Sequence, residues 1–266
     1  MEKMNFRGKW TLVTGASSGL GREMARALAK DYGSNLVVVA RREDRLSDLK
    51  AELESKYQVQ VVSITADLAK PDQVQMLFEQ ATRDRIIYAA VLNAGVTFYG
   101  NVLEQSPEAF DAMLSTNVTS AVQLATRFAQ YFSNHSSGSG LMMVSSMAGF
   151  SPMPYQTAYA ATKSFVTSFG LGLSHELKGK GTSVTVVAPG GIDTEMLKIA
   201  GLSKKFKSGD IGVMSPKVCA RLSLESFASR RSLFIPGILN QAMALAFRLI
   251  PQRLLLTTIA RVYKDA

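Results

Sequence analysis

Residues 10–21 read WTLVTGASSGLG, a short apolar run that passes directly into a glycine-rich turn. The apolar part predicts a β-strand over 10–14, and residues 20–30 continue at helical period. Glycines between a strand and a helix let the backbone approach a pyrophosphate, and the first turn of the helix offers N–H groups that lack partners. We therefore expect a dinucleotide phosphate site formed by Gly15, Ser17, Ser18, Gly19, Leu20 and Gly21.

Outward from this turn, apolar runs alternate with segments of helical period along the whole chain. Further strands are predicted at 35–40, 59–64, 89–92, 141–144, 183–188 and 232–235. This rhythm predicts an α/β fold, in which a parallel sheet carries helices on both faces. The length of 266 residues suits one such domain, which we place at 1–235, followed by a helical tail over 236–266.

Composition limits the cellular setting and the class of partner. Cys219 is the only cysteine, so an intramolecular disulfide is impossible, and residues 1–10 contain no apolar signal segment. Both features predict a cytoplasmic protein. Residues 196–266 contain 12 basic and 3 acidic side chains, whereas residues 1–195 contain 18 of each. The excess suggests an anionic partner near the C-terminal part, but no nucleic-acid recognition motif accompanies it, so we expect no nucleic acid partner.

The second predicted strand ends in two arginines, Arg41 and Arg42. An acidic residue at this strand tip would accept hydrogen bonds from the ribose hydroxyls of NAD, whereas an arginine suits the 2′-phosphate of NADP. We assign the main contact to Arg41 and an auxiliary contact to Arg42. The alternative is a pair of solvated arginines that open the next helix. The pattern favours NADP(H) over NAD(H).

Other strand ends carry further candidate cofactor contacts. Asp67 can accept a hydrogen bond from an adenine amino group, although capping of the helix that starts near Pro71 is an equal alternative. Thr194 can contact a cofactor carboxamide or can cap the helix that follows it. The turn at 93–95 lets a cofactor pass close to the backbone, or is merely a turn. The predicted set is Asp67, Leu68, Asn93, Ala94, Gly95, Pro189, Gly190, Ile192 and Thr194.

One tyrosine of the eight has a lysine four residues later: Tyr159, with Lys163. On a helix this spacing puts both side chains on one face, and an ammonium near a phenol lowers the pKa of the phenol. Such a phenol exchanges a proton with a carbonyl or alcohol oxygen. Ser146, at the end of a predicted strand, offers a second hydrogen bond to that oxygen. The alternative is a solvated helix face that carries a tyrosine and a lysine by chance.

The residues quoted above, in this order, resemble the classical short-chain dehydrogenase/reductase family over about residues 8–195. The family implies a Rossmann-type doubly wound domain with a seven-stranded parallel sheet in the order 3-2-1-4-5-6-7. It also implies that Tyr159 is the general acid in reduction and the base in oxidation, while Lys163 binds the nicotinamide ribose and lowers the pKa of Tyr159. Ser146 then polarises the substrate oxygen. Asn117, a poor helix residue within the predicted helix 109–132, holds a water that links Lys163 to solvent.

The resemblance implies an NADP(H)-dependent oxidoreductase that acts on a carbonyl or secondary alcohol of a fairly apolar small molecule. Two alternatives are a 3-oxoacyl thioester reductase of lipid metabolism and a non-catalytic NADP(H)-sensing protein. Family members form homodimers or homotetramers through helices that here correspond to 109–132 and 157–177. No sequence cluster has metal-ligand spacing, so no metal site is predicted.

The tail at 236–266 departs from the family pattern. Pro251 is expected to divide it into two helices. Its apolar residues recur near helical period, with basic residues between them, which is typical of a helix that contacts an anionic membrane. Covering the substrate cleft and packing on a neighbouring subunit are the favoured alternatives. The segment 197–214, with lysines at 204, 205 and 207, is expected to be a mobile lid or a surface loop.

Replacing Arg41 tests the predicted cofactor preference. Arg41→Ala is expected to weaken NADPH binding by about 10- to 100-fold, because a charge-assisted contact to phosphate contributes roughly 1.5–3 kcal/mol. NADH lacks this phosphate, so its affinity should change little. Titrating both cofactors by fluorescence measures the difference, and an equal loss for both would contradict the assignment.

Overall fold

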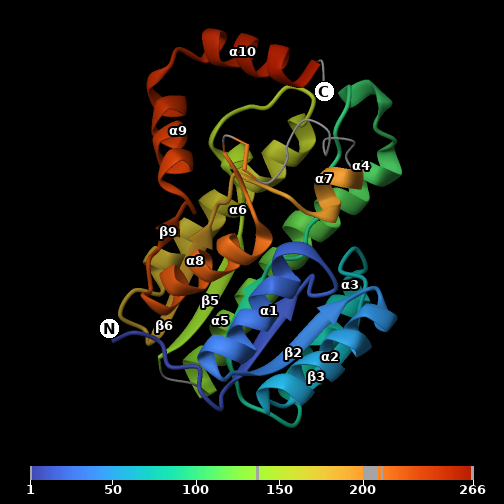
Figure 1. The fold of residues 1–266 in the computed structure, drawn as a ribbon, viewed down its shortest axis with the longest axis vertical. Helices are drawn as coiled ribbons and strands as arrows, with labels where there is room; N and C mark the ends of the chain where they lie inside the picture. Colours follow the sequence, from blue (N-terminus) through green and yellow to red (C-terminus); the bar gives the residue numbers. More distant parts are fainter. Residues whose placement is uncertain (1, 136–137, 200–208, 211, 265–266) are drawn as a thin grey trace.

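The computed structural model describes residues 2–135, 138–199, 209–210 and 212–264. Its central layer is a seven-stranded parallel sheet in the order β3-β2-β1-β4-β5-β6-β9 (Figure 1). These strands are β1 (Trp10–Thr14), β2 (Asn35–Ala40), β3 (Val61–Thr65), β4 (Ile87–Leu92), β5 (Ser139–Val144), β6 (Thr182–Val187) and β9 (Leu233–Phe234).

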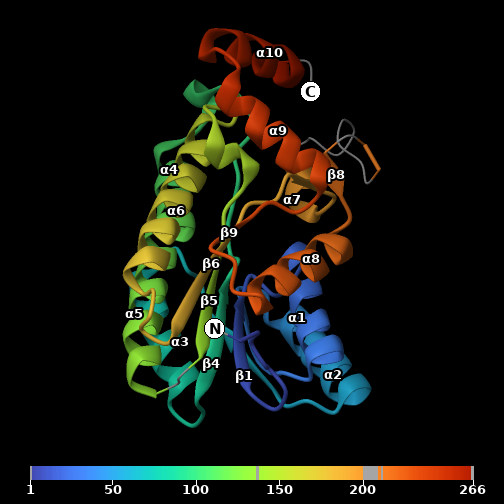
Figure 2. The same cartoon turned by 90° about the vertical axis from the view of Figure 1, so that its left-hand side faces the viewer.

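Helices cover both faces of the sheet, and Figure 2 shows the two layers edge-on. One face carries α1 (Gly19–Tyr32), α2 (Glu43–Tyr57) and α8 (Pro216–Ala228). The other face carries α3 (Pro71–Thr82), α4 (Pro107–Leu114), α5 (Ser120–His135) and α6 (Thr157–Glu176). Shorter elements are the 3-10 turns η1 (Val102–Glu104) and η3 (Met147–Phe150), the π-helical turn η2 (Ser115–Thr119) and α7 (Glu195–Ile199).

The central strands are buried on both faces, as expected for a parallel sheet covered by helices. Every residue of β4, β5 and β6 is buried. Two apolar cores result. One packs α1, α2 and α8 against the sheet around Met24, Leu28 and Phe227, and the other packs α3, α5 and α6 around Leu77 and Phe128.

The predicted fold class and strand order are confirmed, with β9 as the last strand. β9 is shorter than the predicted 232–235, and a separate two-stranded sheet of β7 (Gly191–Ile192) and β8 (Val213–Met214) was not predicted. The predicted helix 109–132 is in fact α4 and α5 joined by η2. Of the predicted lid at 197–214, residues 200–208 and 211, including the three lysines, lie outside the described residues.

The tail forms two helices, α9 (Ile238–Leu249) and α10 (Gln252–Lys264), with Pro251 between them. Proline cannot donate the backbone hydrogen bond that would continue α9, so the chain changes direction there. In both views α10 lies across one end of the molecule, beyond the sheet (Figures 1 and 2). The tail helices therefore lie where the loops that follow the parallel strands converge.

Two glycines of α6 test how closely this helix approaches the sheet. A Cβ on Gly170 would lie 2.5 Å from Val186 Cγ2, whereas a Cβ on Gly172 would meet nothing within 4 Å. Gly170→Ala is expected to lower the free energy of unfolding by about 1–3 kcal/mol through overpacking. Gly172→Ala, the matched control, should raise it by about 0.5–1 kcal/mol, because alanine favours helix. Urea unfolding measures both, and a stabilised Gly170→Ala would contradict the packing.

Candidate functional site

A cavity of about 840 Å³ lies at the carboxyl ends of the sheet strands. Its walls come from the turns that follow β1, β2, β4, β5 and β6, from α6, and from the tail helices. This is where open parallel sheets bind ligands, at the point where β1 pairs with β2 on one side and β4 on the other. The elements that line the cavity come from the whole length of the chain.

The glycine-rich turn and the turn after β4 are fixed to each other at this point. Thr14 Oγ1 accepts hydrogen bonds from the backbone N–H groups of Asn93 and Ala94, each at 3.0 Å. A Cβ on Gly15, whose φ is 70°, would lie 2.8 Å from Asn93 Nδ2, and one on Gly21 would lie 2.4 Å from the Gly15 carbonyl oxygen. Only glycine fits either position.

The same turn has the features of a phosphate cradle. Gly19 begins α1, and the side chain of the N-cap residue Ser18 makes no capping hydrogen bond to the helix. The N–H groups of the first helical turn therefore face the cavity without a side-chain cap, and the helix dipole favours an anion there. The predicted residues Gly15, Ser17, Ser18, Gly19 and Leu20 all line the cavity, whereas Gly21 supports the turn from behind. A dinucleotide phosphate fits this arrangement.

The two arginines after β2 differ in their environment. Arg42 donates hydrogen bonds to Ser17 Oγ at 3.0 Å and to Ser18 Oγ at 2.8 Å, and it forms an ion pair with Glu195 at 3.0 Å. Arg45 also pairs with Glu195, at 2.6 Å. These arginines lower the pKa of the Glu195 carboxyl. Arg41 lines the cavity and is exposed. Arg42, predicted as the auxiliary residue, is thus the arginine that contacts the glycine-rich turn.

Asp67 forms a local turn rather than a helix cap. Its Oδ1 accepts a hydrogen bond from the Ala69 N–H at 3.1 Å, and its own N–H donates to Gln73 Oε1 at 2.6 Å. The N-cap of α3 is Lys70. Asp67 and Leu68 both line the cavity, next to the turn that carries Arg41.

Ser146 and Tyr159 meet in the cavity, where their side chains share a hydrogen bond. Ser146 lies just after β5 and caps η3, since its Oγ accepts a hydrogen bond from the Ala148 N–H at 3.2 Å. The neighbouring Ser145 has a different role, because its hydroxyl is buried and donates to the Lys163 carbonyl at 2.8 Å. The structure therefore brings Ser146, and not Ser145, to the tyrosine.

Lys163 lies one helical turn beyond Tyr159, as its spacing predicts. Its side chain is 5% exposed, and Nζ donates to the Val144 carbonyl oxygen at 3.0 Å. Nζ is 5.7 Å from the centroid of the Tyr159 ring. Burial lowers the pKa of this ammonium to about 8, because removal from water penalises the charged form.

The prediction that the pKa of Tyr159 is lowered is wrong. Burial raises the pKa of this phenol above its ordinary value, and the hydrogen bond with Ser146 opposes the increase only in part. The physical reason is desolvation, since removal from water penalises the charged phenolate. The phenol is therefore protonated near neutral pH, which suits a proton donor.

Asn117 lies at the back of the site, in the π-helical turn η2, and is 2% exposed. Its Oδ1 accepts from the Val96 N–H at 2.8 Å, and its Nδ2 donates to the Val96 carbonyl at 2.9 Å and to Thr162 Oγ1 at 3.1 Å. The helix is thus irregular at Asn117, a residue that fits a regular helix poorly. The Asn117 side chain therefore holds the segment after Gly95 in place. This segment lies beside Lys163, since a Cβ added to Gly95 would lie 3.4 Å from Lys163 Nζ.

The loop after β6 connects the cofactor side of the cavity to the tail. Pro189, Gly190, Ile192 and Thr194 line the cavity, and a Cβ on Gly19 would lie 3.1 Å from Thr194 Cγ2. The buried amide of Asn240 packs on Gly190, where an added Cβ would lie 2.8 Å from it. Asn240 Nδ2 donates to the Pro236 carbonyl at 2.9 Å. Helix α9 therefore packs directly on this loop, residues 189–194, which carries predicted cofactor contacts and which we call the cofactor loop.

The tail also supplies the apolar ceiling of the cavity, which agrees with one of the alternatives that the sequence left open for it. Leu255 and Ile259 of α10 are buried in an apolar cluster with Ala148, Met153 and Ala160. The partly buried Tyr159 packs against this cluster. The Tyr99 hydroxyl donates to the Tyr263 carbonyl and fixes the end of α10. The lining residues missed from the sequence include Met153, Gln156, Glu195, Asn240, Met243, Phe247 and Tyr263. Only the inward spacing 240, 243 and 247 could have indicated those of α9.

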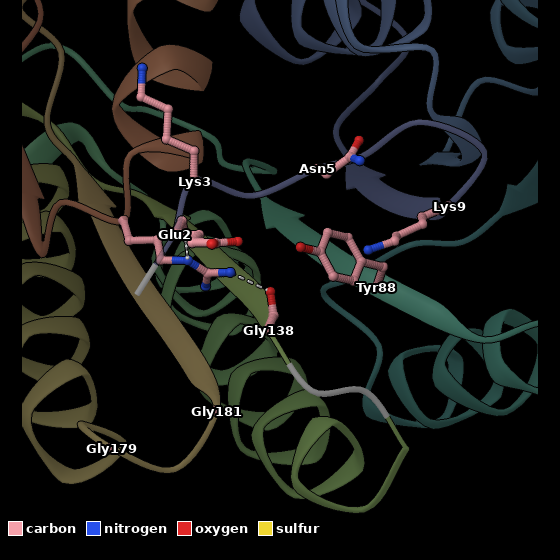
Figure 3. Close-up of a pocket in the computed structure, with 9 residues that line it drawn as sticks. Glu2, Lys3, Asn5, Lys9, Tyr88, Gly138, Gly179 and Gly181 are labelled. Atoms are coloured by element: carbon pink, nitrogen blue, oxygen red, sulfur yellow. Dashed lines mark hydrogen bonds between the residues drawn. The ribbon is translucent and has the colours of Figure 1, made fainter.

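A second cavity, of about 480 Å³, lies at the opposite end of the sheet (Figure 3). It is lined by residues that precede strands, including Lys9 and Gly138. Arg230 donates to the carbonyls of Glu2 and Gly138 and to Ser183 Oγ, so its guanidinium holds the N-terminal segment to the sheet. Lys9 lies 3.9 Å above the Tyr88 ring. These contacts are structural.

Neither a metal-ligand cluster nor a membrane-spanning helix is found among the residues that the structure describes. No group of three His, Cys, Asp or Glu side chains there is placed to hold a metal ion. None of the helices in the described ranges combines the length and the apolar character needed to cross a membrane.

Comparison with known proteins adds to this geometry. A family model described as short chain dehydrogenase matches residues 9–204. The chain belongs to the short-chain dehydrogenase family. The family consists of oxidoreductases that bind a nicotinamide cofactor.

Relatives within the short-chain dehydrogenase family differ in cofactor. The very-long-chain 3-oxoacyl-CoA reductase-B of Danio rerio is 30% identical over 233 residues, 86% of this chain and 72% of that protein. The chain spans 60% to 72% of the length of three reductases of this name. A short-chain dehydrogenase from Sphingobium yanoikuyae in complex with NADPH is 30% identical, with a TM-score of 0.80 over 92% of this chain and 97% of that one. A Burkholderia phymatum member in complex with NAD has a TM-score of 0.84 at 24% identity over 92% and 94%, which shows the fold alone.

The lowered pKa of Lys163 makes stability depend on pH. Between about pH 8 and 10.5 the unfolded lysine holds a proton that the folded one has lost, so the free energy of unfolding should rise through this window, by at most about 3 kcal/mol. Lys163→Met lacks this contribution. Urea unfolding of wild type and variant without nucleotide gives the difference at each pH. The exposed Lys178→Met is the control, and a difference for Lys163→Met that stays flat across the window would contradict the burial.

Proposed function

We propose that this protein is an NADP(H)-dependent oxidoreductase that transfers a hydride between nicotinamide and a carbonyl or secondary alcohol of a large, mostly apolar substrate. The observation that carries the proposal is the hydrogen-bonded pair of Ser146 and Tyr159, with the buried Lys163 behind it, facing a cavity with an apolar ceiling. A carbonyl oxygen that reached both hydroxyls would lie on the floor of this cavity.

Each residue of the group has a distinct part in the proposed reaction. When bound, the nicotinamide supplies the hydride to the carbonyl carbon in the direction of reduction. Tyr159 donates its phenolic proton to the carbonyl oxygen, and its raised pKa keeps that proton in place until the oxygen gains charge. Ser146 donates a hydrogen bond to the same oxygen. Lys163 stabilises the phenolate left behind and would bind the nicotinamide ribose, while Asn117 fixes the wall beside it.

The preference for NADP(H) is supported by the basic wall after β2. Arg42 is held at the rim of the phosphate cradle by Ser17 and Ser18, and Arg41 lies beside it. Both guanidinium groups could contact a 2′-phosphate. The dinucleotide would extend from Asp67 and Leu68 at the adenine end, across the cradle, to Thr194 at the nicotinamide end.

A 3-oxoacyl thioester reductase is the second candidate function. It is supported by the similarity to very-long-chain 3-oxoacyl-CoA reductases and by the basic residues of the C-terminal part, which suit an anionic carrier. The apolar ceiling formed by Leu255 and Ile259 suits an acyl chain as well as a ring system. NADPH oxidation assayed with 3-oxoacyl thioesters of increasing length and with aromatic and steroid ketones separates the two candidates.

We extend the proposal to a homodimer or homotetramer formed through α5 and α6. Phe165 of α6 is exposed and stacks on Phe169 with ring centroids 6.2 Å apart, so this helix presents apolar surface to solvent. Cys219, buried in α8, fits a reducing cytoplasmic setting, because no disulfide is needed for stability.

Removing the phenol separates an enzyme from a nucleotide-sensing protein. Tyr159→Phe is expected to lower the turnover of NADPH with a ketone by about 10²–10⁴-fold, because the proton donor is lost. Fluorescence titration should show NADPH binding as in the wild type. Tyr57→Phe, at the C-terminal end of α2 and outside the cavity, is the matched control. Turnover that survives Tyr159→Phe unchanged would refute the mechanism.

A further inference from the structure

Helix α9 is apolar on two sides, and the structure accounts for only one of them. Its inner side, with Asn240, Met243, Ala244 and Phe247, packs on the cavity and the cofactor loop. Its outer side carries a stripe at 238, 242, 245 and 249, the i, i+4, i+7, i+11 spacing of one helix face. A helix that is apolar all round is normally covered all round.

The outer stripe consists of large side chains in solvent. Ile238 is 87% exposed, Leu245 58% and Leu249 75%. The stripe continues past Pro251 to Leu254 of α10, which is 63% exposed. None of these four residues lines the cavity. We call them the outer tail face, and their exposure is not explained by the binding of cofactor or substrate.

The charges of the tail point to an anionic partner. Residues 237–264 contain three arginines and one lysine, at 248, 253, 261 and 264, and no acidic residue. Arg253, Arg261 and Lys264 are exposed on α10, beside Leu254. Basic side chains that flank exposed leucines are the pattern of a helix that lies in the headgroup region of an anionic bilayer.

We propose that the outer tail face docks on an anionic membrane surface, with α9 and α10 lying on the bilayer rather than crossing it. A second copy of the chain fits less well. The stripe on α9 is about 18 Å long and one helix wide. The area of such a stripe is far smaller than the roughly 800 Å² that each partner buries in a stable complex. A twofold contact would also bring the basic tail against its own copy.

The docking surface is continuous with the cavity wall. Ile250, which follows the last residue of α9, and Val262 of α10 line the cavity and are partly exposed. If the proposed function holds, a lipid-soluble substrate would pass from the bilayer into the site along these helices. Binding to the membrane itself does not depend on that function, so the two are tested separately.

Vesicle flotation tests the proposal with the full chain. Vesicles of phosphatidylcholine with phosphatidylglycerol should float the protein, and pure phosphatidylcholine or high salt should release most of it, because salt screens the basic residues. Leu249→Ser with Leu254→Ser should lower the bound fraction at least about tenfold, since each leucine loses its burial in the acyl region. Arg253→Glu with Lys264→Glu should have a similar effect through charge.

Matched controls come from the turn before β4, at the opposite end of the sheet strands from the tail. Ile86 is 61% exposed there, and Arg83 lies in the same turn. Ile86→Ser with Arg83→Glu should bind vesicles as the wild type does. Circular dichroism and thermal unfolding confirm that each variant is folded. Tyr159→Phe should float with the vesicles as the wild type does while it loses turnover. Vesicle binding can therefore be interpreted even if the proposed reaction is wrong.

Two outcomes would overturn the proposal. One is a wild type that does not bind anionic vesicles, or that binds them no better than the Leu249→Ser and Leu254→Ser variant does. The other is a wild type that sediments as a dimer without lipid and becomes a monomer in that variant. The second result would assign the outer tail face to a contact between copies of the chain.

Discussion

The close seating of α6 on the end of β5 is the contact on which the active site depends. Ser145 Oγ donates to the Lys163 carbonyl, Ser164 Oγ donates to the Gly149 carbonyl, and Lys163 Nζ donates to the Val144 carbonyl. A Cβ on Gly149 would lie 2.7 Å from the Lys163 carbonyl oxygen, so only glycine permits this approach. The three bonds fix the helix in rotation and in height, and they bring Tyr159 to Ser146. A phenol and a hydroxyl held on two rigid elements need no reorganisation before proton transfer.

The nucleotide side of the cavity depends on a different kind of constraint, namely backbone without side chains. Gly15 and Gly21 allow the β1–α1 turn to pack on the turn after β4, and Thr14 joins the two turns through its hydroxyl. The first N–H groups of α1 are then directed at one place. Arg42 is added to this cradle through its bonds to Ser17 and Ser18. Backbone dipoles and a fixed guanidinium therefore lie together at one place that suits an anionic group.

The C-terminal tail covers part of the cavity. Helix α9 sits on the cofactor loop through Asn240, and α10 covers the tyrosine through Leu255 and Ile259. The tail thus shares the walls of the cavity with the loops that follow the sheet strands. Because α9 and α10 also carry the exposed outer tail face, any partner that binds this face is one helix thickness away from the site.

The sequence by itself determined the α/β class and the pairing of Tyr159 with Lys163 on one helix, because both depend on local spacing, whereas the order of the strands followed from the resemblance to a family. A strand followed by a glycine-rich turn has few alternatives, and Tyr159 and Lys163 share a helix face whatever surrounds that helix. The tertiary structure decided the rest. The direction of the Tyr159 pKa shift depends on burial and on the hydrogen bond with Ser146, neither of which is local. The apolar repeat of the tail could not reveal which side faced inward. Met243 and Phe247 face the cavity, whereas Leu245 and Leu249 face solvent, because a helix with two apolar sides takes its orientation only from what it packs against.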